Sequence, residues 1–92
     1  MNTKKHVRFS GRVQGVYFRA TTKRKADELG VFGWVRNMED GSVEAVFEAG
    51  SESVVNQLID WCANSVPMAR VTDVDAKDYT SEEKFAEFEI KG

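Results

Sequence analysis

The feature that most limits how this chain can fold is the spacing of its apolar residues. Along the 92 positions this spacing changes repeatedly between a pattern typical of strands and one typical of helices. In five segments the apolar side chains alternate with polar or small ones, or form a short run, as in a β-strand. In two segments, residues 18–29 and 52–66, they recur every three or four positions, as on one face of an amphipathic helix. The predicted strands are residues 7–13, 31–38, 42–49, 70–79 and 85–91.

Turn and cap residues mark the ends of these predicted elements. Gly30 follows the first helix at the usual position of a helix C-cap. Asp40-Gly41 separates two predicted strands and is typical of a hairpin turn. Ser51 is a predicted N-cap of the second helix. That helix should end before Pro67, because the residue that precedes a proline disfavours the helical conformation.

This order of elements predicts an α+β fold. It is the ferredoxin-like βαββαβ sandwich, in which two helices cover one face of a mainly antiparallel sheet. In the last strand we expect Ala86, Phe88 and Ile90 to point inward, because side chains alternate between the two faces of a strand. The fold alone does not define a function, since this plan hosts many unrelated activities.

Composition and length place the chain among folded proteins of one domain. The sequence is 41% hydrophobic and 30% charged, values typical of a soluble globular domain. It has no apolar run of the roughly 20 residues that a membrane span requires, and its polar start differs from a secretory signal. The single cysteine, Cys62, permits no internal disulfide and is compatible with a reducing compartment. We therefore expect one domain over residues 1–92 that is monomeric, cytoplasmic and not bound to a membrane.

Charge is distributed unevenly along the chain, although the net charge is only −2. Residues 1–25 contain eight lysines and arginines and no acidic residue, whereas the remainder contains five of these cations against 15 acids. A local positive field in an acidic protein favours a small anion over a nucleic acid, because the chain as a whole would repel a polyphosphate backbone. A solvated basic face is the other interpretation of the same residues.

The segment GRVQGVYFR, residues 11–19, joins the first predicted strand to the first helix. The first N–H groups of a helix have no partner within it and carry the positive end of the helix dipole. Gly15 would let the chain curl so that these groups converge, which is how backbone cradles bind phosphate or sulfate. Arg19 stands in the first helical turn, where a cation is unfavourable unless an anion lies between it and the amides. An ordinary strand-to-helix turn with a solvated arginine is equally compatible with these residues.

Two segments carry a resemblance to a known family. GRVQGVYFR resembles the signature of the acylphosphatases, and GWVRNMEDGSVE, residues 33–44, resembles their second signature. The resemblance covers essentially the whole chain. It implies the ferredoxin-like fold and metal-free, cofactor-free hydrolysis of the carboxyl–phosphate bond of a small-molecule acyl phosphate. It also implies catalytic roles for Arg19 and Asn37, and a loop that binds phosphate or sulfate through Gln14, Gly15, Val16, Tyr17, Phe18 and Arg19.

The chemistry of Arg19 and Asn37 agrees with these implied roles. A guanidinium stays protonated and can hold two phosphate oxygens, whereas an amide can orient a water molecule but cannot act as a base at neutral pH. Such a pair supplies positioning and charge stabilisation, which suits a bond that is already activated. The alternative interpretation is that Asn37 is only a turn residue before Asp40-Gly41, with no part in catalysis.

Other functions are weaker interpretations of the sequence. RNA-recognition domains share the βαββαβ order, but the segment SVEAVFEA carries acids where their basic and aromatic motif would stand. A sensor that binds phosphate without hydrolysing it would differ only at Asn37, since it needs no group to orient water. Cys62 is expected on the buried helix face and His6 in solvent, and the sequence has no spacing typical of a metal site.

Overall fold

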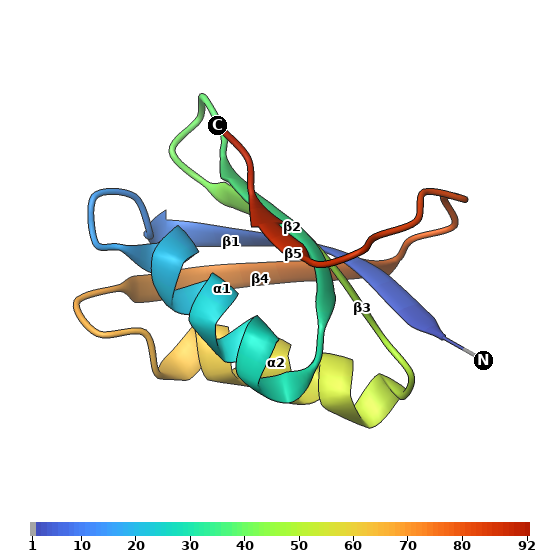
Figure 1. The fold of residues 1–92 in the computed structure, drawn as a ribbon. Helices are drawn as coiled ribbons and strands as arrows, with labels where there is room; N and C mark the ends of the chain where they lie inside the picture. Colours follow the sequence, from blue (N-terminus) through green and yellow to red (C-terminus); the bar gives the residue numbers. More distant parts are fainter. Residues whose placement is uncertain (1) are drawn as a thin grey trace.

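The computed structural model describes residues 2–92, which form a five-stranded sheet with two helices on one face (Figure 1). The strand order is β4-β1-β3-β2-β5, in which β5 pairs parallel with β2 and the other neighbours pair antiparallel. The α+β, ferredoxin-like prediction is therefore confirmed. The elements are β1 (Thr3–Arg12), α1 (Phe18–Leu29), β2 (Phe32–Asn37), β3 (Val43–Ala49), α2 (Glu52–Asn64), β4 (Arg70–Asp78) and β5 (Phe88–Ile90).

Three of the predicted end signals act as expected. Gly30 caps the C-terminus of α1 in the left-handed conformation, with φ of 74°. The Ser51 hydroxyl accepts a hydrogen bond from the backbone N–H of Val54 at 3.2 Å, which caps the N-terminus of α2. The helix α2 ends at Asn64, before Pro67. These local signals define where α1 ends and where α2 begins and ends.

The hydrophobic core fills the space between the sheet and the helices. Phe9 of β1 packs against Phe18 at the start of α1, with ring centroids 5.2 Å apart. Phe47 of β3 packs against Phe88 of β5, with centroids 5.8 Å apart. Burial of each such side chain contributes about 1.5–3 kcal/mol. The start of α1 and the last strand are therefore both anchored in the same core.

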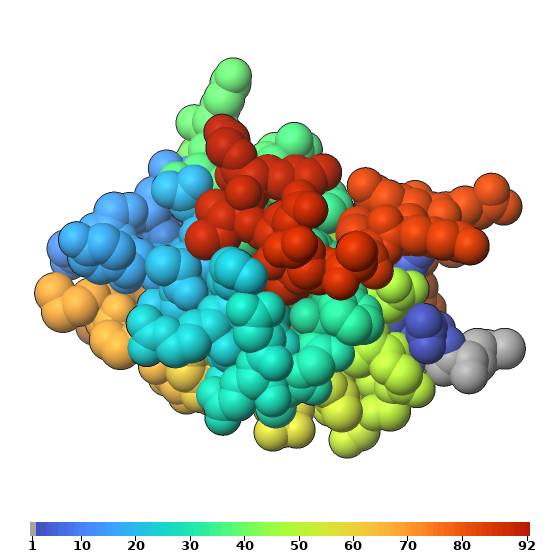
Figure 2. Space-filling model, viewed as in Figure 1, coloured from blue at the N-terminus to red at the C-terminus, as the bar shows by residue number. Residues whose placement is uncertain are grey.

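The last strand is shorter than predicted. It contains three residues that pair with residues 33–35 of β2, and Phe88 alone among its predicted inward residues is buried. Ala86 is exposed and Ile90 is 42% exposed, so the prediction that both point into the core is wrong. The reason is that β5 is an edge strand, and Ile90 lies at the rim of the helix-covered face rather than beneath a helix. Figure 2 shows the C-terminal segment lying against α1.

One close approach between β2 and β3 depends on glycine. Gly33 has φ of 135°, and a Cβ added there would lie 1.8 Å from the backbone oxygen of Val46. Any side chain at this position would push β2 away from β3. The same displacement would move Asn37, which lies at the end of β2.

Candidate active site

The loop between β1 and α1 combines left-handed backbone conformations with two buried side chains. Gly15 and Tyr17 both adopt left-handed conformations, with φ of 76° and 60°, while the side chains of Val16 and Phe18 are buried in the core. Within residues 2–92, no backbone carbonyl accepts a hydrogen bond from the N–H groups of residues 15–19. The loop therefore presents a row of free donors at the positive end of α1.

The N-terminus of α1 lacks the groups that usually complete a helix start. Tyr17 at the cap position makes no side-chain capping bond, and the first turn contains no acidic residue. Arg19 lies there instead, half-buried, and it forms no ion pair with any residue between 2 and 92. A cation at this end of the dipole costs about 0.3–1 kcal/mol. An anion bound between Arg19 and the amides would reverse that effect.

Asn37 approaches the loop from the end of β2. It shares the helix-facing side of the sheet with Val35, whereas Arg36 lies on the other face and pairs with Glu44 at 2.7 Å. The Oδ1 atom of Asn37 is buried and has no hydrogen-bond partner among the residues that the structure describes. A buried carbonyl without a partner costs about 1–3 kcal/mol. This oxygen is thus an acceptor available to a donor bound beside it.

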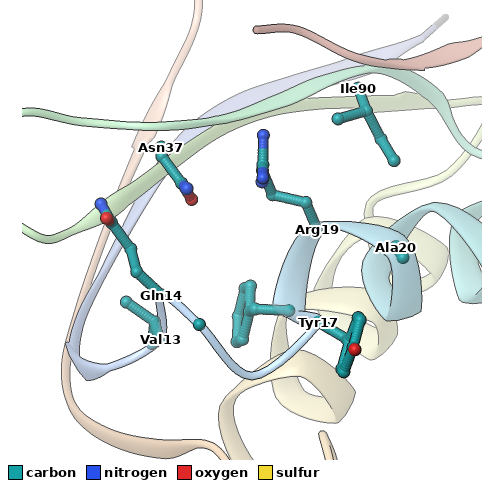
Figure 3. A pocket seen from close by; sticks show the side chains of 9 residues that line it. Val13, Gln14, Tyr17, Arg19, Ala20, Asn37 and Ile90 are labelled. Atoms are coloured by element: carbon teal, nitrogen blue, oxygen red, sulfur yellow. The ribbon is translucent and has the colours of Figure 1, made fainter.

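A cavity of about 410 Å³ joins the loop, Arg19 and Asn37 (Figure 3). In that view Asn37 and Gln14 lie on one side, Arg19 lies in the middle, and Ala20 and Tyr17 lie on the other side. Of the residues predicted to form the site, Val16 alone does not line the cavity, and its side chain is in the core. The lining residues are Val13, Gln14, Gly15, Tyr17, Phe18, Arg19, Ala20, Asn37 and Ile90.

Gln14 connects the loop to the hairpin that follows Asn37. Its Nε2 atom donates to the backbone oxygen of Met38 at 2.8 Å and to that of Ser42 at 2.9 Å. Both hydrogens of the side-chain amide are therefore used within the protein. The side chain holds the loop at a fixed distance from Asn37.

Comparison with known proteins agrees with this geometry. A sequence model of the acylphosphatase family matches residues 5–90. The chain belongs to the acylphosphatase family. An acylphosphatase of Haloquadratum walsbyi is 53% identical over 89 residues, which cover 97% of this chain and 94% of the relative. One of Methylococcus capsulatus is 49% identical over 85 residues, covering 92% and 91%. The crystal structure of acylphosphatase from Bacillus subtilis is similar at a TM-score of 0.90 and 33% identity, with 100% of both chains covered.

Membership in the acylphosphatase family defines the class of reaction. The chain is a hydrolase of acyl phosphates, as the two sequence motifs predicted. The alternatives of an RNA-binding module and of a phosphate sensor are therefore set aside. No helix within residues 2–92 has the length and apolar character needed to cross a membrane.

Three residues that line the acylphosphatase cavity were not predicted from the sequence, namely Val13, Ala20 and Ile90. Val13 and Ala20 adjoin the predicted loop, so a wider boundary around that motif would have included them. Ile90 comes from the other end of the chain. It reaches the cavity because the parallel pairing of β5 with β2 places it beside Val35, two residues before Asn37. No local pattern in the sequence indicates that pairing.

Half of the eight cations in residues 1–25 are neutralised by acids elsewhere. These four side chains form surface ion pairs, which contribute little to stability. Arg19 has no such partner among residues 2–92, and it lines the cavity. The pairs are Lys4–Glu48 at 3.6 Å, Lys5–Glu52 at 3.5 Å, Lys23–Asp27 at 3.0 Å and Lys25–Glu28 at 3.2 Å.

Cys62 and His6 lie outside the cavity. Cys62 is buried on α2 as predicted, and burial raises the pKa of its thiol to about 12, although a hydrogen bond with Thr22 opposes the shift. His6, predicted as a solvated strand residue, is 30% exposed on β1, and its Nε2 lies 2.6 Å from Oε2 of Glu44 on the neighbouring strand β3, a partner that was not predicted. Burial alone would raise the pKa of Glu44, but its hydrogen bonds with His6 and Arg36 outweigh that effect and lower it.

Proposed function

We propose that this cavity is the active site and that it holds an acyl phosphate for attack by water. The phosphoryl group binds the N–H groups of residues 15–19, and the Arg19 guanidinium holds two of its oxygens. The Oδ1 atom of Asn37 accepts a hydrogen bond from the attacking water. One observation carries this proposal, namely that three sets of polar groups without internal partners meet in a single cavity: the loop amides, Arg19 and Asn37.

The reaction requires no protein nucleophile. The water oxygen bonds to phosphorus while the bond from phosphorus to the acyl oxygen breaks, and that electron pair leaves on the carboxylate. A proton of the water passes to a phosphoryl oxygen, which gives a carboxylate and inorganic phosphate as products. Neither Arg19 nor Asn37 accepts the proton, so these residues act through charge stabilisation and orientation. Because the transition state is loose, holding the equatorial oxygens is the largest part of the task.

Phosphate release from benzoyl phosphate, measured with a chelator present, tests this mechanism. We expect metal-free turnover by the wild type, because Arg19 and the loop amides supply the positive charge. In Asn37→Ala we expect kcat to fall by about 100-fold, since the water loses its orientation, while inorganic phosphate still binds. Asn56→Ala, at an exposed position of α2, is the matched control. Full turnover in Asn37→Ala would contradict the role of this residue, and loss of activity with chelator would contradict the metal-free reaction.

We also propose that the enzyme acts as a monomer in the cytoplasm, with phosphate and sulfate as simple competitive ligands. A single chain brings the β1–α1 loop, Arg19 and Asn37 together at one cavity. The free, buried Cys62 suits a reducing compartment. Specific activity should not change with protein concentration, and a dependence on concentration would contradict the monomer.

A further inference from the structure

A bridge formed by the side chain of Gln14 links the two parts of the site that differ in chemical task. Gln14 directly precedes Gly15 in the β1–α1 loop, and its Nε2 atom donates to the backbone oxygens of Met38 at 2.8 Å and Ser42 at 2.9 Å. A carbonyl oxygen can only accept a hydrogen bond, so the nitrogen of the amide, not its oxygen, faces the hairpin. Since Met38 directly follows Asn37, the bridge joins residues adjacent to the loop amides and to Asn37 (Figure 3).

The hairpin of residues 38–42 does not need this bridge to satisfy its own backbone. The Met38 oxygen also accepts from the Gly41 N–H at 3.2 Å, and the Ser42 oxygen also accepts from the Met38 N–H at 2.8 Å. The Asp40 carboxylate accepts from the N–H of Ser42 at 2.9 Å and from its hydroxyl at 2.6 Å, which closes the turn. The two bonds from Gln14 therefore add the attachment of this hairpin to the loop.

The position of the Asn37 side chain depends on that attachment. Its Oδ1 atom is buried and has no hydrogen-bond partner within residues 2–92, so no such contact orients this oxygen. Asn37 is the last residue of β2, and the backbone beyond it belongs to the hairpin that Gln14 holds. On the other side of the bridge, Val13 and Val16 are buried in the core and anchor the loop around Gln14. The bridge thus sets the separation between Asn37 and the loop amides.

We propose that Gln14 is a positioning residue for the hydrolysis step, because it keeps the water at Asn37 aligned with the phosphoryl group. This inference rests on the proposed function, since that function puts the water at Asn37 and the phosphoryl group at the loop amides. In phosphoryl transfer the attacking and leaving oxygens lie roughly in line. A misplacement of about 1 Å can lower the rate of such a step by about 100-fold. Binding of phosphate itself depends on the loop amides and Arg19, which the bridge leaves in place.

Gln14→Met tests this role, because it removes both N–H donors and retains a long, unbranched side chain. We expect kcat for benzoyl phosphate to fall by about tenfold, while the inhibition constant of inorganic phosphate stays within about twofold of the wild type. In the double variant with Asn37→Ala we expect no further loss of kcat beyond that of Asn37→Ala alone, since Gln14 acts through Asn37. Gln57→Met, at an exposed position of α2 outside the cavity, is the matched control and should change neither constant.

Gln14→Glu provides a second test with a readout that a purely structural role would not move. An ionised carboxylate cannot donate to the two hairpin carbonyls, whereas a protonated carboxyl can donate to one of them. The kcat of this variant relative to the wild type should therefore rise as the pH falls from 7 through about 4.3, the ordinary pKa of a glutamate. The same ratio for Gln14→Met should stay constant with pH. Asp40 of the hairpin and Arg19 of the cavity are common to all these proteins, so their charges do not alter the comparison.

Several results would overturn the positioning role of Gln14. An unchanged kcat in Gln14→Met would do so, as would a loss of kcat that multiplies with that of Asn37→Ala or that Gln57→Met shares. A rise in the inhibition constant of phosphate as large as the fall in kcat would show that Gln14 shapes the phosphate loop instead. Failure of the proposed function has a different signature, because full turnover in Asn37→Ala would contradict that mechanism whatever Gln14→Met does.

Discussion

The two junctions where a strand passes into a helix differ in how the helix begins. At the junction of β3 and α2, Ser51 accepts a hydrogen bond from the Val54 N–H, and Glu52 lies in the first turn. At the junction of β1 and α1, Tyr17 makes no capping bond, and Arg19 is in the first turn with no acidic residue beside it. The start of α2 is capped by groups of the protein itself. At the start of α1, the N–H donors and the positive charge of Arg19 have no partner within residues 2–92.

The start of α1 lacks the two stabilising groups that the start of α2 has, as the proposed phosphate site would require. A serine or aspartate cap and a first-turn acid would each stabilise α1 by several tenths of a kcal/mol to about 1 kcal/mol. Either group would also occupy the donors, or oppose the negative charge, that a phosphoryl group needs. Under the proposed function, the start of α1 is therefore less stable without a ligand than it could be, and it binds the phosphoryl group more tightly as a result. Functional sites commonly lower the stability of a protein in this way.

The largest effect on the first junction should come from Arg19→Gln. Loss of a guanidinium from a phosphoryl-transfer site lowers kcat/KM by about 1,000-fold, because the charge of the transition state loses its main partner. The free energy of unfolding should not fall, since a cation is removed from the positive end of a helix. Steady-state kinetics and urea unfolding measure the two effects.

Arg24→Gln is the control for Arg19→Gln, because Arg24 lies on the same helix but is exposed and outside the cavity. It should retain the activity of the wild type. Similar losses in the two variants would show that the overall charge of α1 matters rather than the position of Arg19.

An intermediate effect should come from Gly15→Ala. An added Cβ meets no atom within 4 Å, so the substitution acts through the backbone alone, where φ is 76°. The strain should lower the free energy of unfolding by about 1–2 kcal/mol. A shift of the loop amides of the order of 1 Å should lower kcat/KM by about 100-fold.

Gly50→Ala provides the same substitution at the second junction. Gly50 also has open space around its Cβ position, but its φ is not in the left-handed region. Activity should remain unchanged and the free energy of unfolding should stay within about 0.5 kcal/mol of the wild type. Equal loss of activity in the two glycine variants would contradict the role given to the first loop.

The smallest effect should come from giving α1 the first-turn acid that α2 has. Ala20→Glu should raise the free energy of unfolding by about 0.3–1 kcal/mol through the helix dipole. The same carboxylate would line the cavity and repel the phosphoryl group, so KM should rise by about tenfold. Thermal unfolding and kinetics at one ionic strength measure these opposite changes.

Ser51→Ala makes the reverse change at α2. Loss of the cap should lower the free energy of unfolding by about 1 kcal/mol and leave kcat/KM unchanged, because Ser51 is outside the cavity. If Ala20→Glu left KM unchanged, or if Ser51→Ala altered it, the distinction between the two helix starts would be wrong.

The sequence predicts the features of this site that depend on neighbouring residues. The glycine break at Gly15, the cation at Arg19 and the position of Asn37 before a hairpin all lie in short segments, and the caps at Gly30 and Ser51 follow from similar local signals. Such features are encoded by spacing over a few residues, which a single sequence displays directly.

The sequence does not predict features that depend on strand register. The partner of His6 is Glu44, the amide of Gln14 bonds to Met38 and Ser42, and Ile90 reaches the cavity through β5. Each contact joins segments far apart in the chain, and a shift of one residue in pairing would break it. Local patterns carry no information about such a shift.

The parallel pairing of β5 with β2 has a consequence for how the protein is made. Of the described elements, β5 is synthesised last, yet it supplies Phe88 to the core and Ile90 to the cavity. The amide cradle, Arg19 and Asn37 leave the ribosome earlier. A chain that ends at residue 85 would hold the β1–α1 loop, Arg19 and Asn37 but would lack both Phe88 and Ile90. Because Phe88 belongs to the same core as Phe18 at the start of α1, the cavity can take its final form only after the last strand has been made.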